Sequence, residues 1–245
     1  MIPKIIHYCW FGNNSMPKLA ELCISSWKKY LPDYELRLWN EKNFNVNEIP
    51  YVKEAYESKK FAFVTDYVRL YVLYTYGGIY MDTDVEVLKN LDVFLQLPAF
   101  TGFENPREVP TGIMASKKNG DWVREQLELY NGRKFILPDG SMDLTTNVQT
   151  ITLKMQEDGF LLNNSYQIYK EQMHVFPKDY FCPKESSGLI KLTNNSHCIH
   201  HFSGSWQPMR LKVKKFFFRK IVGVKLTNML VITKKKLKIF FTVRK

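Results

Sequence analysis

The chain has 245 residues, of which 45% are hydrophobic, so it can bury the core of one domain and is not a disordered chain. Its formal net charge is +11, but residues 209–245 hold 13 of the 35 Lys and Arg and no Asp or Glu. The first 208 residues are therefore nearly neutral, which argues against a nucleic-acid-binding body.

Cysteine usage and hydropathy indicate the compartment. Cys9, Cys23, Cys182 and Cys198 lack the spacing of a metal site, and nothing in their positions demands a disulfide. The first residues lead straight into a strand-like run without a secretory signal, and no run of 18 apolar residues follows. We expect a protein of the reducing cytoplasm without a spanning helix.

The first forty residues predict a strand, a helix and a second strand. The strands are expected at 4–11 and 34–39, and the helix starts near Pro17. This order opens an α/β nucleotide-binding unit, in which ligands bind beyond the carboxyl ends of the strands. Tyr8, Trp10 and Asn40 lie there and are candidates for a nucleotide-sugar site, although Trp10 is as easily explained as a core residue.

The central stretch, residues 61–87, is the segment around which we expect the chain to be organised. Apolar residues recur at helical spacing from Phe61 to Thr75, and Gly77 and Gly78 favour a helix end. Residues 79–85 then alternate like a strand.

Two acidic residues in this strand are candidate metal ligands. Alternation puts Asp82 and Asp84 on one side, where their carboxylates would repel each other unless a cation sits between them. Oxygen ligands suit Mg²⁺ or Mn²⁺, which complete their shells with water and phosphate oxygens. Asp66 and Arg69 share a face of the preceding helix and could hold a ribose, a sugar or a diphosphate. The alternative is that both strand aspartates simply face water.

Further strands are expected at 99–103 and 111–116, and helices at 121–130 and 148–157. The polar segment 131–147 is a good place for acceptor recognition. Its last residues, Thr145, Thr146 and Asn147, either donate to sugar hydroxyls or cap the next helix, and capping is the favoured interpretation.

The end of the chain contains two features. Three of the five histidines fall within 197–201, and a single His could complete a two-Asp cation site. Residues 209–245 interleave apolar and basic residues like an amphipathic helix that lies on an anionic membrane surface. A partner-binding helix and a solvated charged end are the alternatives.

Three separated motifs, IPKIIHYCWFG, FVTDYVRLYVLYTYGGIYMDTDVEVL and HHFSGSW, together resemble the DXD-motif glycosyltransferases of family 32. This family includes capsular and surface polysaccharide enzymes and is related to initiating mannosyltransferases and to the glucosyltransferase domains of large clostridial cytotoxins. The resemblance covers residues 1–208. It implies a single GT-A domain with a central, mostly parallel sheet flanked by helices, which binds a nucleotide-sugar with Mn²⁺ or Mg²⁺.

The resemblance also implies roles for individual residues. The donor site would contain Trp10, Asp66, Arg69, Tyr80, Asp82, Ser205 and Trp206, and the metal ligands would be Asp82, Asp84 and His201. Related toxins place an acid near the third ligand, so His201 is a departure from their pattern.

The sequence therefore predicts a metal-dependent sugar transferase that retains anomeric configuration and uses a nucleotide-sugar donor, with a UDP-sugar favoured. The acceptor would be a glycan or a lipid-linked oligosaccharide in bacterial surface polysaccharide synthesis, at the inner face of the cell membrane. The alternatives are a metal-dependent phosphodiesterase and a membrane-associated adaptor with a vestigial sugar site. Residues 209–245 would form a separate basic extension.

Overall fold

The computed structural model describes residues 1–185 and 187–204. The predicted donor-site residues Ser205 and Trp206 and the basic extension 209–245 lie outside these residues. The chain divides into two units, and every helix and strand described below belongs to the first, which comprises Met1–Pro183 and Leu192–Phe202. In the second unit, a short antiparallel bridge joins Lys184 and Ile190.

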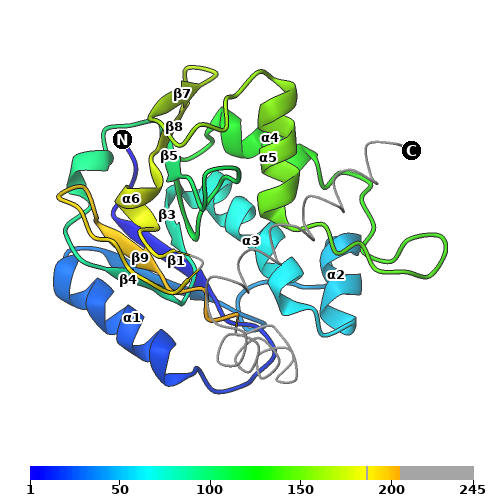
Figure 1. The fold of residues 1–245 in the computed structure, drawn as a ribbon. Helices are drawn as coiled ribbons and strands as arrows, with labels where there is room; N and C mark the ends of the chain where they lie inside the picture. The colour runs from blue at the N-terminus through cyan, green and yellow to red at the C-terminus, as the bar shows by residue number, and fades with distance from the viewer. Residues whose placement is uncertain (186, 205–245) are drawn as a thin grey trace. The chain divides into compact units, whose positions relative to one another are not determined.

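A large sheet forms the centre of the first unit (Figure 1). It has seven strands in the order β2-β1-β3-β6-β5-β8-β7. The strands are β1 (Ile5–Cys9), β2 (Glu35–Trp39), β3 (Gly78–Met81), β5 (Ala99–Gly102), β6 (Ile113–Ser116), β7 (Gln167–Tyr169) and β8 (Met173–Phe176). Five of the seven strands run in the same direction, and β6 and β7 run the other way. The predicted α/β class with a mostly parallel sheet is therefore confirmed. A second sheet pairs β4 (Val85–Val87) with β9 (Cys198–His200) in antiparallel fashion.

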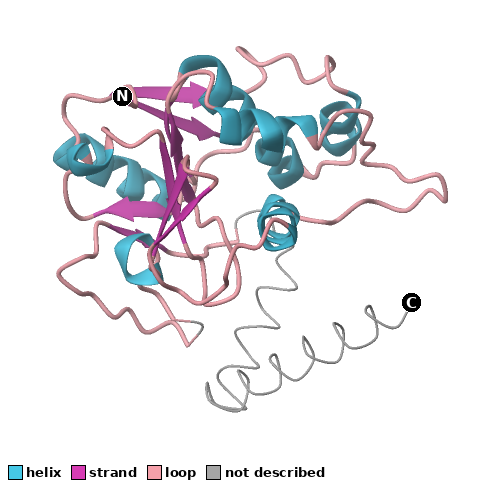
Figure 2. Ribbon diagram, turned by 90° about the horizontal axis from the view of Figure 1, so that it is seen from above, coloured by secondary structure: helices cyan, strands magenta, loops and turns pink. Residues whose placement is uncertain are grey.

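Helices cover both faces of the large sheet (Figure 2). The helices are α1 (Lys18–Tyr30), α2 (Pro50–Glu57), α3 (Phe61–Tyr76), α4 (Asp121–Glu128), α5 (Asn147–Glu157) and α6 (Lys178–Phe181), with a 3-10 turn, η1, at Asp92–Phe94. None of the described helices is both long enough and apolar enough to cross a bilayer.

The strands separate two hydrophobic clusters because their side chains alternate between the faces. Tyr80 and Met114 point into a cluster built with α2, α3, α4 and α5. Ile79, Met81 and Ile113 belong to the other cluster, which includes residues of α1, α6 and the small sheet. Burial on both faces explains why the central strands read as nearly continuous apolar runs.

The central stretch forms the predicted helix and glycine turn but not the predicted single strand. Helix α3 ends at Tyr76, and Gly77 follows with a φ of +68°, which glycine adopts without steric cost. Strand β3 stops at Met81, and the chain then turns, with the Val85 N–H donating to the Asp82 carbonyl at 2.9 Å. The expected strand from Ile79 to Val85 is therefore wrong, because this turn divides it into β3 and β4, which belong to different sheets.

Candidate active site

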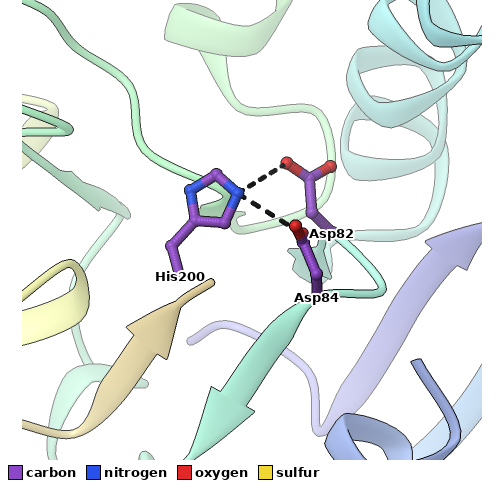
Figure 3. A group of neighbouring side chains, drawn as sticks. All are labelled: Asp82, Asp84 and His200. Atoms are coloured by element: carbon purple, nitrogen blue, oxygen red, sulfur yellow. Dashed lines mark ion pairs between the residues drawn. The ribbon is translucent and has the colours of Figure 1, made fainter. Parts of the chain in front are cut away.

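Two carboxylates and one imidazole meet where the large and small sheets adjoin. The His200 Nε2 lies 3.3 Å from Asp84 Oδ1 and 3.8 Å from Asp82 Oδ2 (Figure 3). One potential ligand atom from each of the three residues lies within 4.8 Å of the others. Their side chains are 10% (His200), 13% (Asp84) and 25% (Asp82) exposed, so the group is largely shielded from water.

The backbone explains how residues so far apart in sequence converge. The turn after β3 carries both aspartates, and the Asp82 N–H donates to the Gly112 carbonyl at 2.8 Å. Strand β4 then pairs with β9 so that Val85 lies opposite His200. The pairing of these two short strands brings the late histidine beside the two acids.

The electrostatics of the group favour a positive charge between the acids. Burial by itself would lower the pKa of His200, but Asp84, Cys182 and Asp82 outweigh it and hold that pKa well above its ordinary value. The donor set, two carboxylates and an imidazole, fits Mn²⁺ or Mg²⁺, and the imidazole makes the set more suitable for Mn²⁺. These three side chains would hold the ion and leave its other positions for phosphate oxygens and water.

The structure groups a different histidine with the two aspartates from the one named from the sequence. It brings His200, not His201, into the three-residue group. The His201 Nε2 lies 2.8 Å from Glu86 Oε2, and its backbone N–H donates to the Asp84 carbonyl. Alternation along β9 puts His200 on the same side as the fully buried Cys198, but this pattern alone does not distinguish a ligand from a core residue.

Arg69 connects the aspartate turn to helix α3. Its Nη2 lies 3.2 Å from Asp82 Oδ1 and 3.3 Å from Asp66 Oδ1, and its guanidinium lies 4.6 Å from the centre of the Tyr80 ring. The Tyr80 hydroxyl donates to Asp82 Oδ1 at 2.9 Å. Although burial opposes the charged form, Asp82, Tyr80 and Asp66 hold the pKa of Arg69 above its ordinary value. The predicted residues Asp66, Arg69, Tyr80 and Asp82 therefore form one buried network.

Asp66 connects this network to the start of helix α5. Its Oδ2 accepts the Asn147 backbone N–H at 2.9 Å, at the start of α5, while its Oδ1 faces Arg69. Burial raises its pKa to about 6, against the opposing effect of Arg69 and the Asn147 N–H. Thr146 caps α5 through a capping box with Gln149, which confirms the capping interpretation.

The other residues predicted to bind the nucleotide-sugar lie near the carboxyl ends of β1 and β2. Trp10 is half-buried, and its indole N–H donates to the Asn14 carbonyl at 2.6 Å. The Tyr8 ring meets the Trp27 ring edge-on at 5.4 Å, and the Asn40 side chain accepts from the Lys42 N–H. Their contact with a nucleotide stays a prediction.

Comparison with known proteins agrees with this site. Residues 17–101, which include Asp66, Arg69, Asp82 and Asp84, match a family model described as a glycosyltransferase sugar-binding region containing a DXD motif. This match supports the resemblance to DXD-motif glycosyltransferases over that region.

Relatives are similar over different parts of the chain. Inositol phosphoceramide mannosyltransferase 3 of Schizosaccharomyces pombe is 33% identical over 124 residues, 48% of this chain and 34% of that protein. Inositol phosphoceramide mannosyltransferase 2 of the same yeast is 26% identical over 84% of this chain and 58% of its own length. The chain thus spans between a third and three fifths of these two relatives.

A viral protein and a solved structure are also similar. An uncharacterized glycosyltransferase of Acanthamoeba polyphaga mimivirus is 26% identical over 89% of this chain and 88% of its own length. The crystal structure of a glycosyltransferase involved in the glycosylation of the major capsid of PBCV-1 superposes with a TM-score of 0.49 and 12% identity, covering 82% of this chain and 95% of that one.

Proposed function

We propose that the protein is a metal-dependent glycosyltransferase of the GT-A type, in family 32, that moves a sugar from a nucleotide-sugar to an acceptor hydroxyl. The observation that carries the proposal is the convergence of Asp82, Asp84 and His200 beside Arg69, with Arg69 and both aspartates inside the region that matches DXD-motif glycosyltransferases. Two acids and one imidazole suit a cation that also binds a diphosphate, and the buried arginine adds a fixed positive charge nearby.

Each residue of the candidate site has a separate role in the proposed reaction. Asp82, Asp84 and His200 would hold a Mn²⁺ or Mg²⁺ ion, which would supply positive charge for the leaving diphosphate. Arg69 adds to this stabilisation, and its fixed position between Asp66 and Asp82 keeps reorganisation small. Asp66 and Tyr80 orient the arginine and the aspartate turn. The acceptor hydroxyl attacks on the face from which the phosphate leaves, and that phosphate takes its proton, so the configuration is retained. NMR of the product anomer tests this; an inverted product would contradict it.

The donor and acceptor are proposed from the resemblance and from the names of the relatives. A UDP-sugar is the first candidate, with glucose, galactose and their N-acetyl forms, and the mannosyltransferase relatives add mannose. The acceptor is a glycan or a lipid-linked oligosaccharide in surface polysaccharide synthesis. The fact that those relatives are named for a phosphoceramide supports a lipid-linked acceptor. We place the reaction at the cytoplasmic face of the cell membrane.

A donor screen tests the activity. UDP-, GDP- and CMP-sugars are compared by thermal shift and by slow hydrolysis, with and without Mn²⁺. One nucleotide-sugar should raise the melting temperature and be hydrolysed only with the ion. Asp84→Asn should abolish both effects, whereas Asp121→Asn, an exposed aspartate at the start of α4, should leave them unchanged.

The same assay, extended with a glycan acceptor and a phosphodiester substrate, decides between the alternatives. Binding of a nucleotide-sugar without hydrolysis or transfer would favour a non-catalytic adaptor. Metal-dependent cleavage of a phosphodiester without sugar transfer would favour a phosphodiesterase. Either result would remove the transferase proposal.

A further inference from the structure

The sheet register places a further carboxylate, Glu104, near the cation group. Strands β3 and β5 run in the same direction on either side of β6, where Met81 pairs with Ile113 and Thr101 pairs with Met114. β3 leads into Asp82 at the same edge of the sheet at which β5 leads into Glu104. Carboxyl ends of strands are the usual place for ligand-binding groups in α/β folds.

Two backbone contacts fix Glu104 beside the histidine. The Glu104 N–H donates to the Glu108 carbonyl at 2.9 Å, and the Cys182 thiol lies 3.4 Å from the Glu104 carbonyl, to which it donates. The same thiol lies close enough to His200 to contribute to its raised pKa. Glu104 and His200 therefore share Cys182 as a common neighbour, so the position of Glu104 is tied to that of the group.

The carboxyl of Glu104 is desolvated but not used within the protein. Among residues 1–185 and 187–204 it makes no hydrogen bond and no ion pair, although the residue is only partly exposed. Asp66, Asp82 and Asp84, in contrast, face Arg69, Tyr80 or His200. Burial raises the pKa of Glu104 to about 7, and the charges of His200, Asp82 and Arg69 reach it. An acid without a partner, kept away from water beside the group, has its oxygens available for a ligand.

We propose that Glu104 is a further catalytic residue of this site, whose carboxylate stabilises the positive charge that develops on the transferred sugar. This inference rests on the proposed transferase activity. When the bond from the sugar to the diphosphate breaks, negative charge moves towards the cation and Arg69, and the sugar becomes oxocarbenium-like. A carboxylate in a poorly hydrated site stabilises that charge more strongly than one in water does. Glu104 forms no covalent bond in this role.

Glu104→Gln keeps the size of the side chain and removes its charge. We expect the rate constant for Mn²⁺-dependent transfer or donor hydrolysis to fall about 10²- to 10³-fold, the usual loss for a group that stabilises developing charge. The donor KM and the affinity for Mn²⁺ alone, measured by electron paramagnetic resonance, should stay within about two-fold of wild type, because the charge acts after binding.

Glu108→Gln is the matched control, because Glu108 belongs to the same loop and its carboxylate is bonded to Asn105. This control should keep the wild-type rate. Glu104→Asp has the charge on a shorter side chain and should recover part of the rate. A purely structural role for Glu104 would not predict this recovery. Melting temperatures of all variants show whether each is folded.

Two results would overturn the assignment. A ten-fold loss of Mn²⁺ affinity in Glu104→Gln would make Glu104 a cation ligand, and an unchanged rate would leave it without a catalytic role. Failure of the proposed function is distinguishable, since a wild-type protein that processes no nucleotide-sugar removes both proposals. An active wild type with an equally active Glu104→Gln removes only this one.

Discussion

At the scale of single residues, His7 shows how the hydrogen-bond partners determine a protonation state. The Trp39 indole can only donate, so the His7 Nδ1, 3.0 Å away, must accept. The His7 Nε2 lies 2.8 Å from the Gly77 carbonyl, which can only accept, so that nitrogen carries the proton. The neutral ring thus joins β1, the end of β2 and the end of α3 inside the core. Burial lowers its pKa to about 4.

His7 should therefore make the protein less stable in mild acid. The unfolded chain takes up a proton near pH 6.5 and the folded chain only near pH 4, so stability is lost as the pH falls between them. From pH 7 to pH 5 this group should remove about 2 kcal/mol from the free energy of unfolding. Urea unfolding of wild type and His7→Gln at several pH values measures it. Parallel pH curves for the two proteins would refute the effect.

Gly112 provides the space in which His200 lies. A Cβ there would stand 3.0 Å from His200 Cε1, 3.0 Å from His200 Nδ1 and 3.0 Å from Val85 Cγ2. Its φ lies outside the left-handed region, so alanine is acceptable to the backbone and its cost is steric. The Gly112 carbonyl also accepts the Asp82 N–H, so Gly112 contacts both the aspartate turn and His200.

Gly112→Ala should weaken Mn²⁺ binding about ten-fold, the lower end of the range for displacing a supporting contact. The added methyl pushes the imidazole away from the acids. Val85→Ala in the same chain removes the opposing methyls and should restore most of the affinity. Paramagnetic resonance titrations of both variants and of Val85→Ala alone make the comparison. Wild-type affinity in Gly112→Ala, or no recovery in the double variant, would contradict it.

At the scale of elements, α3 carries a buried ion pair whose matched counterpart on α4 is exposed. Asp66 and Arg69 are three residues apart and are 11% and 9% exposed. Asp121 and Arg124 have the same spacing, but their side chains are about half exposed. Removing Asp66 leaves the buried Arg69 with Asp82 as its remaining carboxylate partner and so weakens its compensation, whereas an exposed pair contributes little.

Asp66→Ala should therefore lower the free energy of unfolding by about 3 kcal/mol, since it also leaves the Asn147 N–H at the start of α5 without its acceptor. Asp121→Ala should cost less than about 1 kcal/mol. Denaturant unfolding of both variants under the same conditions measures the difference, and equal losses would show that burial does not determine the strength of this pair.

Elements defined by local pattern were predictable, and those defined by pairing were not. The apolar period of α3 and the glycines after it predict both the helix and its end. The alternating pattern of residues 79–85 does not reveal the break after Met81. The break arises because β4 leaves the large sheet and pairs with β9, which lies more than a hundred residues later in the chain. The same pairing selects His200, so the third member of the group needed tertiary information that neighbouring residues do not carry.

At the scale of the whole molecule, the charge is divided between a nearly neutral part and a basic part. We infer that residues 209–245 attach the protein to an anionic membrane, because each of the 13 basic residues near such a surface contributes about 1 kcal/mol. A chain that ends at residue 208 should keep Mn²⁺-dependent donor hydrolysis and lose binding to phosphatidylserine vesicles in a sedimentation assay. Unchanged binding would refute the anchoring role.

The convergence of the aspartate turn and β9 has a consequence for the lifetime of the protein. An ion shared by Asp82, Asp84 and His200 would act as a removable cross-link between the turn after β3 and the last strand, β9, of the first unit. Because the unfolded chain has no such site, an ion at a hundred times its dissociation constant would add about 2.7 kcal/mol to the free energy of unfolding. A cell short of the metal would then degrade the protein faster, so ion supply would set the abundance of the enzyme as well as its rate.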